Sequence, residues 1–197
     1  MADTSHRRPV GPAPDAAELH DAALDYLARY AATGAGLCRV LERRVDRWAR
    51  RAAAVGDAET IAAEAAVARA MVQDVVARLV AAGAVNDAAY AESRARSLVR
   101  AGRSRAAAVA YLAAKGVDPT TAQAALPCDD ASELAAALVL ARKRRIGPFR
   151  PGEIPDEPGR RRELGMLARA GFSQDVARRA LAMDTDAAEA LVNRLRR

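Results

Sequence analysis

The sequence predicts an all-α fold, an elongated, curved array of tandem three-helix repeats. Hydrophobic residues make up 51% of the chain but aromatic residues only 4%, and much of the apolar fraction is alanine, a strong helix former. A helical pattern over 108–118, an apolar face closed by a glycine, an apolar residue and a polar residue, recurs over 163–173. A repeated hairpin of this size buries its apolar face only against neighbouring copies.

Glycines and prolines divide the chain into units. Residues 1–16 are expected to form a disordered or extended lead, because proline and glycine recur there without helical periodicity. The expected order after this lead is a long first three-helix repeat, a second, a third interrupted by a proline-rich loop at 147–159, and a C-terminal helix, with the bounds 17–83, 86–126, 130–183 and 185–197. Gly83, Gly102, Gly116 and Gly171 are predicted to end helices.

The helix predicted over 37–51 has two chemically distinct faces. Leu37, Leu41, Val45 and Trp48 share one side because they are spaced by three or four residues. Arginines repeat with the same spacing on the opposite side, at Arg39, Arg43, Arg47 and Arg50. The apolar face is suited to burial, and the arginine face is suited to binding anions. The preceding helix is expected to break at 33–36, where two glycines lie close together.

Polar residues mark the expected helix starts. Ser104 and Asp118 each precede a helical pattern, and Pro119 fits the first helical position because its missing N–H is not needed there. Asn86 or Asp87, and Asp129 or Asp130, are further N-cap candidates. The basic run 142–145 closes a helix, where cations interact favourably with the helix C-terminus.

Charge favours an anionic partner. The formal net charge is +6, and guanidinium groups present planar donors suited to phosphate and carboxylate. Exposed arginines also simply solvate helices, and this alternative stays open. The binding candidates on helix surfaces or ends are Arg39, Arg43, Arg47, Arg50, Arg103, Arg105, Arg142, Lys143, Arg144 and Arg145.

Residues for catalysis are scarce. His6 falls in the predicted lead and His20 is isolated, and no phosphate-binding, zinc-protease or nucleophile-elbow motif is present. Cys38 and Cys128 are far apart and form no metal or disulfide pattern. We therefore expect a non-enzymatic, cytoplasmic, monomeric protein without metal or cofactor, and no membrane span.

Sequence-specific DNA recognition is not favoured. The helix expected after Asp118 offers Thr120, Thr121 and Gln123 but no basic residue to anchor phosphates. Tyr90, Tyr111, Trp48 and Phe172 occupy or adjoin predicted buried stripes, which leaves few aromatic rings for base stacking.

Three passages resemble the bacterial RecX family, whose members modulate the RecA recombinase: 23–27 with 37–47, 79–91, and 102–117. The second passage has a glycine, two apolar residues, a polar and an acidic residue, then an aromatic residue and alanine. Asn86 stands where the family commonly has an acidic residue. The third ends in leucine, two alanines, lysine, glycine and valine.

The resemblance implies tandem three-helix repeats that bind along the groove of the RecA–DNA filament and restrain strand exchange, ATP hydrolysis or filament growth. By this similarity, Arg103, Arg105 and Lys115 match basic positions around the central repeat. The alternative from another class is a stand-alone protein that binds single- or double-stranded DNA through phosphate contacts.

Overall fold

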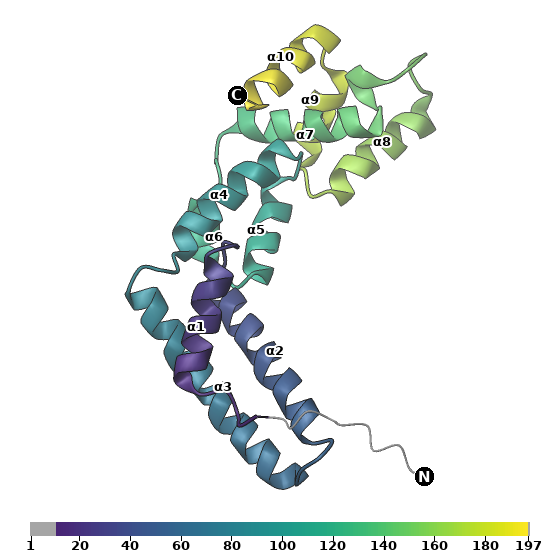
Figure 1. Ribbon diagram of the computed structural model, residues 1–197. Helices are drawn as coiled ribbons and strands as arrows, with labels where there is room; N and C mark the ends of the chain where they lie inside the picture. The colour runs from purple at the N-terminus through teal and green to yellow at the C-terminus, as the bar shows by residue number, and fades with distance from the viewer. Residues whose placement is uncertain (1–10, 197) are drawn as a thin grey trace, which may run out of the picture. The chain divides into compact units, whose positions relative to one another are not determined.

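The computed structural model describes residues 11–196, which form ten α-helices, one 3-10 helix and no strand (Figure 1). The predicted all-α class is therefore confirmed. The elements are α1 (Ala16–Leu27), α2 (Gly34–Ala52), α3 (Ala58–Ala81), α4 (Asp87–Arg100), α5 (Arg105–Ala114), α6 (Pro119–Ala124), α7 (Asp130–Arg144), η1 (Gly147–Phe149), α8 (Glu157–Arg169), α9 (Gln174–Ala182) and α10 (Thr185–Arg196). They divide into two compact units, one ending at Asp87 and one beginning at Ala88.

The first unit is a bundle of α1, α2 and α3, which lie side by side in Figure 1. The predicted apolar stripe of α2 supplies Leu37, Leu41 and Val45, each at most 1% exposed, to its core. Val72 and Val75 of α3 are fully buried in the same cluster. Burial of one stripe fixes which way α2 faces, and its arginines are left on the outside.

The prediction that 33–36 breaks a helix is wrong. Thr33 is the N-cap of α2, and its hydroxyl accepts a hydrogen bond from the Gly36 N–H at 2.9 Å. Gly34 and Gly36 thus lie inside the first turn of α2, where a capped start tolerates them. The break falls earlier, between Leu27 and Thr33.

The predicted lead lies partly outside the described residues, which begin at Gly11. Asp15 is the N-cap of α1, and its carboxylate accepts from the Glu18 N–H at 2.8 Å. The Trp48 indole N–H donates to the Gly11 carbonyl at 2.9 Å. Gly11 and Asp15 therefore have defined contacts, which agree with the extended alternative expected for the lead.

A long-range contact closes the first unit. The Gly34 N–H donates to the Asp87 carboxylate at 2.8 Å. The sequence suggested Asp87 only as a possible N-cap of the helix that follows it. In the structure Asp87 is the first residue of α4, and its carboxylate binds the N-terminus of α2. A carboxylate at this place is stabilised by the N-terminal partial charge of α2.

The second unit has its own core, to which every helix from α4 to α10 contributes. Helix α7 provides Leu134, Leu138 and Ala141, all predicted to point inward and all buried. It packs against α9 and α10 (Figure 1). Phe172, 4% exposed, joins the same core from the corner between α8 and α9.

The predicted helix stops are confirmed. Gly83, Gly102, Gly116 and Gly171 each have a positive φ, between 73° and 89°, a conformation that glycine adopts without steric cost. The predicted N-caps also hold, since Ser104, Asp118 and Asp129 each accept a hydrogen bond from the third residue after them. Local chemistry thus sets the helix bounds in this part of the chain.

The proline-rich segment contains more helix than predicted. Gly147–Phe149 forms a 3-10 turn, and α8 begins at Glu157 although Pro158 follows directly. Proline fits the first turn because its missing N–H has no intrahelical partner there. Asp156 caps this helix by accepting from the Gly159 N–H at 2.9 Å. None of the helices in the described chain is both long and apolar enough to span a membrane.

Candidate arginine-rich interface

The predicted arginine face of α2 is exposed. Arg39, Arg43, Arg47 and Arg50 all lie on the solvent side of the helix, opposite the buried stripe. Successive members at four-residue spacing are about 6 Å apart along the helix axis. The face therefore presents a row of cations along one helix.

The two acidic residues of α2 point toward α3. Asp46 forms an ion pair with Arg69 at 2.7 Å, and Glu42 accepts from the Gln73 amide at 3.2 Å. These contacts keep both carboxylates away from the arginine row. Within residues 11–196, no ion pair involves Arg43, Arg47 or Arg50.

Arg105 differs from the other candidates, because its guanidinium group is used inside the protein. It donates to the carbonyl oxygens of Leu126 and Pro127 at 2.8 Å and of Gln123 at 3.0 Å. Its backbone N–H donates to the Glu133 carboxylate at 3.0 Å. The structure thus gives this side chain a stabilising role at the end of α6 that sequence reasoning missed.

The basic run 142–145 also contains an internal contact. The Lys143 ammonium donates to the Ala101 carbonyl at 2.6 Å, directly after the end of α4. Arg145 ends α7 in the left-handed conformation, with φ of 55°. Arg142 and Arg145 line a depression of about 500 Å³ together with Arg150, so the structure brings three arginines of the second unit together. Arg144 is exposed nearby in sequence.

A further pair of cations meets at Tyr111. The Arg94 guanidinium lies 5.0 Å from the ring centroid and donates to the hydroxyl at 2.9 Å. The Lys115 ammonium lies 5.5 Å from the same centroid. Arg103 is exposed just after Gly102. Sequence reasoning identified Lys115 but not Arg94, because the ring that Arg94 contacts lies 17 residues away on another helix.

His20 is half-buried, and its Nδ1 lies 3.8 Å from the Asp21 carboxylate. Burial raises the pKa of the Cys38 thiol, which disfavours the reactive thiolate. Among the described residues, no three metal-ligating side chains gather in one place.

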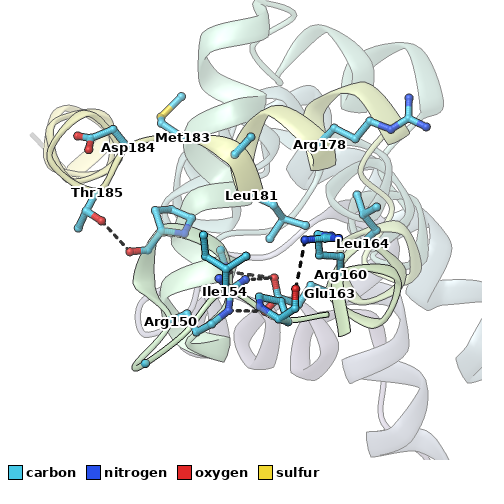
Figure 2. Close-up of a pocket in the computed structure, with 15 residues that line it drawn as sticks. Arg150, Ile154, Arg160, Glu163, Leu164, Arg178, Leu181, Met183, Asp184 and Thr185 are labelled. Atoms are coloured by element: carbon cyan, nitrogen blue, oxygen red, sulfur yellow. Dashed lines mark hydrogen bonds and ion pairs between the residues drawn. The ribbon is translucent and has the colours of Figure 1, made fainter. Parts of the chain in front are cut away.

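The second unit also contains a cavity of about 700 Å³ (Figure 2). It is lined by the loop after α7, by α8, by α9 and by the start of α10. An ion pair between Arg150 and Glu163 forms part of its wall. None of the three residues Arg150, Glu163 and Arg178, all of which line it, was a candidate from the sequence.

The sequence of this chain is similar to that of several known proteins. Residues 86–126 match the family model described as RecX, second three-helix domain. The chain is 42% identical over 165 residues to regulatory protein RecX of Myxococcus xanthus, covering 83% of each chain. It is 41% identical over 110 residues to that of Agrobacterium fabrum, covering 56% of this chain and 58% of the relative.

A third relative, regulatory protein RecX of Amycolatopsis mediterranei, is 41% identical over 107 residues, 53% of this chain and 59% of that protein. No solved structure matches the chain. The agreement of a domain model, several relatives and an all-helical architecture leads to one conclusion: the chain belongs to the RecX family of regulatory proteins.

Proposed function

We propose that this protein is a non-enzymatic regulator that binds the RecA–DNA filament and restrains recombinase activity, strand exchange and filament growth. Membership of a family of regulatory proteins supports a regulatory role. The observation that carries the proposal is the row of exposed arginines on α2, whose neighbouring carboxylates are engaged by α3.

The chemistry of this row suits a long polyanion. Guanidinium groups bind phosphate and carboxylate through paired donors. A nucleoprotein filament offers DNA phosphates beside the acidic side chains of its protein coat. Several cations on one helix can contact such a surface together, and their attraction speeds encounter as well as strengthening binding.

Charge reversal of the α2 row tests the proposal. The double variant Arg43→Glu and Arg47→Glu is expected to lower affinity for recombinase-coated single-stranded DNA at least about tenfold. Both side chains are exposed, so the helical content should stay unchanged by circular dichroism. Binding is followed by fluorescence anisotropy of the labelled DNA within the filament.

The matched control reverses two exposed arginines of the second unit, Arg162→Glu and Arg194→Glu, which changes the net charge equally. It should keep most of the affinity. Equal losses in the two double variants would show that overall charge, and not the α2 row, drives binding. Unchanged binding in both at low salt would remove α2 from the interface.

Stand-alone nucleic-acid binding is the second candidate, and the cation pair at Tyr111 is the observation that favours it. It predicts tight binding to bare DNA that weakens steeply with salt, because each phosphate contact releases a counterion. A titration on bare and on recombinase-coated single strands separates the two. The filament proposal requires preference for the coated strand, and equal affinity would favour the second candidate.

A further inference from the structure

The cavity of the second unit has walls that are held in place. The Arg150 guanidinium makes two hydrogen bonds to the Glu163 carboxylate, one of them 3.0 Å from Nε to Oε1 (Figure 2). Glu163 is only 9% exposed and also accepts from the Gly147 N–H at 3.3 Å. The Thr185 hydroxyl donates to the Pro148 carbonyl at 2.9 Å. These bonds tie the loop after α7 to α8 and α10.

Gly147 brings this loop close to α9. Its φ is 57°, and a β-carbon at this position would lie 2.9 Å from Leu181 Cδ2 and 3.0 Å from Leu181 Cα. Only glycine permits so close an approach in this conformation. The cavity is therefore a preformed feature, and preformed sites bind without a large ordering cost.

Apolar side chains dominate the lining. Leu164, Leu181 and Met183 are half-buried and border the cavity. Ile154, on the loop, also borders it and is 79% exposed. Covering this side chain with another apolar group is favourable, because it removes apolar surface from water. The volume of about 700 Å³ lies in the range of ligand pockets.

Two arginines of α8 and α9, Arg160 and Arg178, border the cavity, and Figure 2 shows the Arg178 side chain extending away from Arg160 and Glu163. Arg160 shares the Glu157 carboxylate with Arg161, so one anion faces two cations. Exposed Arg178 forms no ion pair with any residue in 11–196.

The nearby acids do not compensate Arg178. Asp175 is paired with Arg179 at 3.1 Å. Asp184 accepts the N–H groups of Asp186 and Ala187 at the start of α10. A ligand for this site therefore needs an anionic group beside an apolar group.

We propose that the cavity is a docking site for a short acidic segment of a partner protein. One aliphatic or aromatic side chain of the segment enters between Leu181 and Ile154, and an adjacent carboxylate binds Arg178. The site lies on elements of the second unit and shares no residue with the α2 row. The inference goes beyond the proposed filament binding and does not depend on it.

A peptide fits the site better than a nucleic acid. None of the described residues that line the cavity is aromatic, and single-strand binders stack bases on aromatic rings. A phosphate backbone would leave Ile154 and Leu181 uncovered. In a peptide, an apolar side chain can cover the apolar wall while an adjacent carboxylate pairs with Arg178.

The test uses the full chain and a fluorescein-labelled peptide of leucine, phenylalanine, aspartate and glutamate flanked by glycine and serine. We expect saturable binding by fluorescence anisotropy. Arg178→Glu should weaken it about tenfold, as should Ile154→Ser, which corresponds to losing one covered aliphatic side chain. Both positions are exposed, so neither change threatens folding.

Two variants serve as matched controls. Arg162→Glu reverses an exposed arginine of α8 outside the lining, and Val67→Ser removes an apolar side chain that is 58% exposed on α3. Both should bind the peptide like the unaltered protein. Absence of saturable binding, equal binding of a peptide with lysine in place of the acids, or displacement by an oligothymidylate strand would each overturn the proposal.

Discussion

The Ser104 hydroxyl donates a hydrogen bond to the Ala170 carbonyl at 2.7 Å, across 66 residues of sequence. The same oxygen accepts from the Ala107 N–H at 3.2 Å and thereby caps α5. Ser104 is fully buried. One side chain thus caps its own helix and joins the corner after α4 to the corner after α8.

This double role makes Ser104 more important for stability than an ordinary cap. Ser104→Ala should lower the free energy of unfolding by about 2–3 kcal/mol, because it removes the cap and leaves the Ala170 carbonyl without its partner. Ser173→Ala is the control, since its hydroxyl caps α9 through the Val176 N–H. It should lose about 1 kcal/mol. Urea unfolding measures both, and equal losses would contradict the joining role.

Gly171 packs directly on this contact. A β-carbon at Gly171 would lie 2.6 Å from the Ser104 hydroxyl oxygen, whereas one at Gly83 would meet nothing within 4 Å. Gly83→Ala should therefore lower the free energy of unfolding only through the backbone strain of a positive φ, by about 1–2 kcal/mol. Gly171→Ala should cost about 1–3 kcal/mol more because of the clash.

A double variant checks this explanation. Combining Gly171→Ala with Ser104→Ala removes the oxygen that clashes with the new β-carbon. The double variant should therefore lose less free energy of unfolding than the two single variants lose together. Denaturant unfolding of the four proteins gives the coupling. Additive losses would show that the clash is not with Ser104.

Arg105 should respond to a conservative change. Arg105→Lys keeps the charge but cannot reach three carbonyl oxygens with a planar group, so we expect a loss of about 1–2 kcal/mol in the free energy of unfolding. Arg103→Lys, at an exposed neighbour, should change stability by less than about 0.5 kcal/mol. If Arg105→Lys were equally neutral, the carbonyl contacts would not stabilise the end of α6.

Asp129 gives a pH-dependent prediction. Hydrogen bonds from the Ser132 hydroxyl and N–H, both at 2.7 Å, lower the pKa of this carboxyl below its ordinary value of 3.8. A lowered folded-state pKa means stability that is present above the unfolded pKa and lost as pH falls through the folded value.

Asp129→Asn keeps an acceptor but removes the charge. At neutral pH the melting temperature of this variant should be lower than that of the unaltered protein. The difference between the two melting temperatures should disappear as pH drops below about 4. A gap that is constant with pH would mean that the charge of Asp129 adds nothing to its cap.

The helix ends could be predicted from the sequence because their causes are local. Gly102, Gly116 and Gly171 stop helices through their own φ, and Ser104 and Asp118 cap helices through bonds to the third residue after them. The same kind of local reasoning failed at Thr33. The two glycines after it predicted an interruption between helices, but Thr33 is the N-cap of α2.

The roles of charged residues were less predictable. The arginine row of α2 followed from helical periodicity, because four-residue spacing places side chains on one face. Arg105 and Lys143 looked equally available, but their partners are carbonyl oxygens that lie 18–42 residues away in sequence. No local pattern encodes such a partner.

By itself, the sequence determined the helical class, most helix starts and stops, the two-faced character of α2 and the family resemblance. These depend on composition, on intervals of three or four residues and on short motifs. Only the tertiary structure decided that Asp87 binds the start of α2, that Glu163 holds Arg150 against a cavity, and that Gly171 adjoins Ser104. Such contacts depend on how separate helices pack, which is set by the burial of whole apolar faces and not by any one segment.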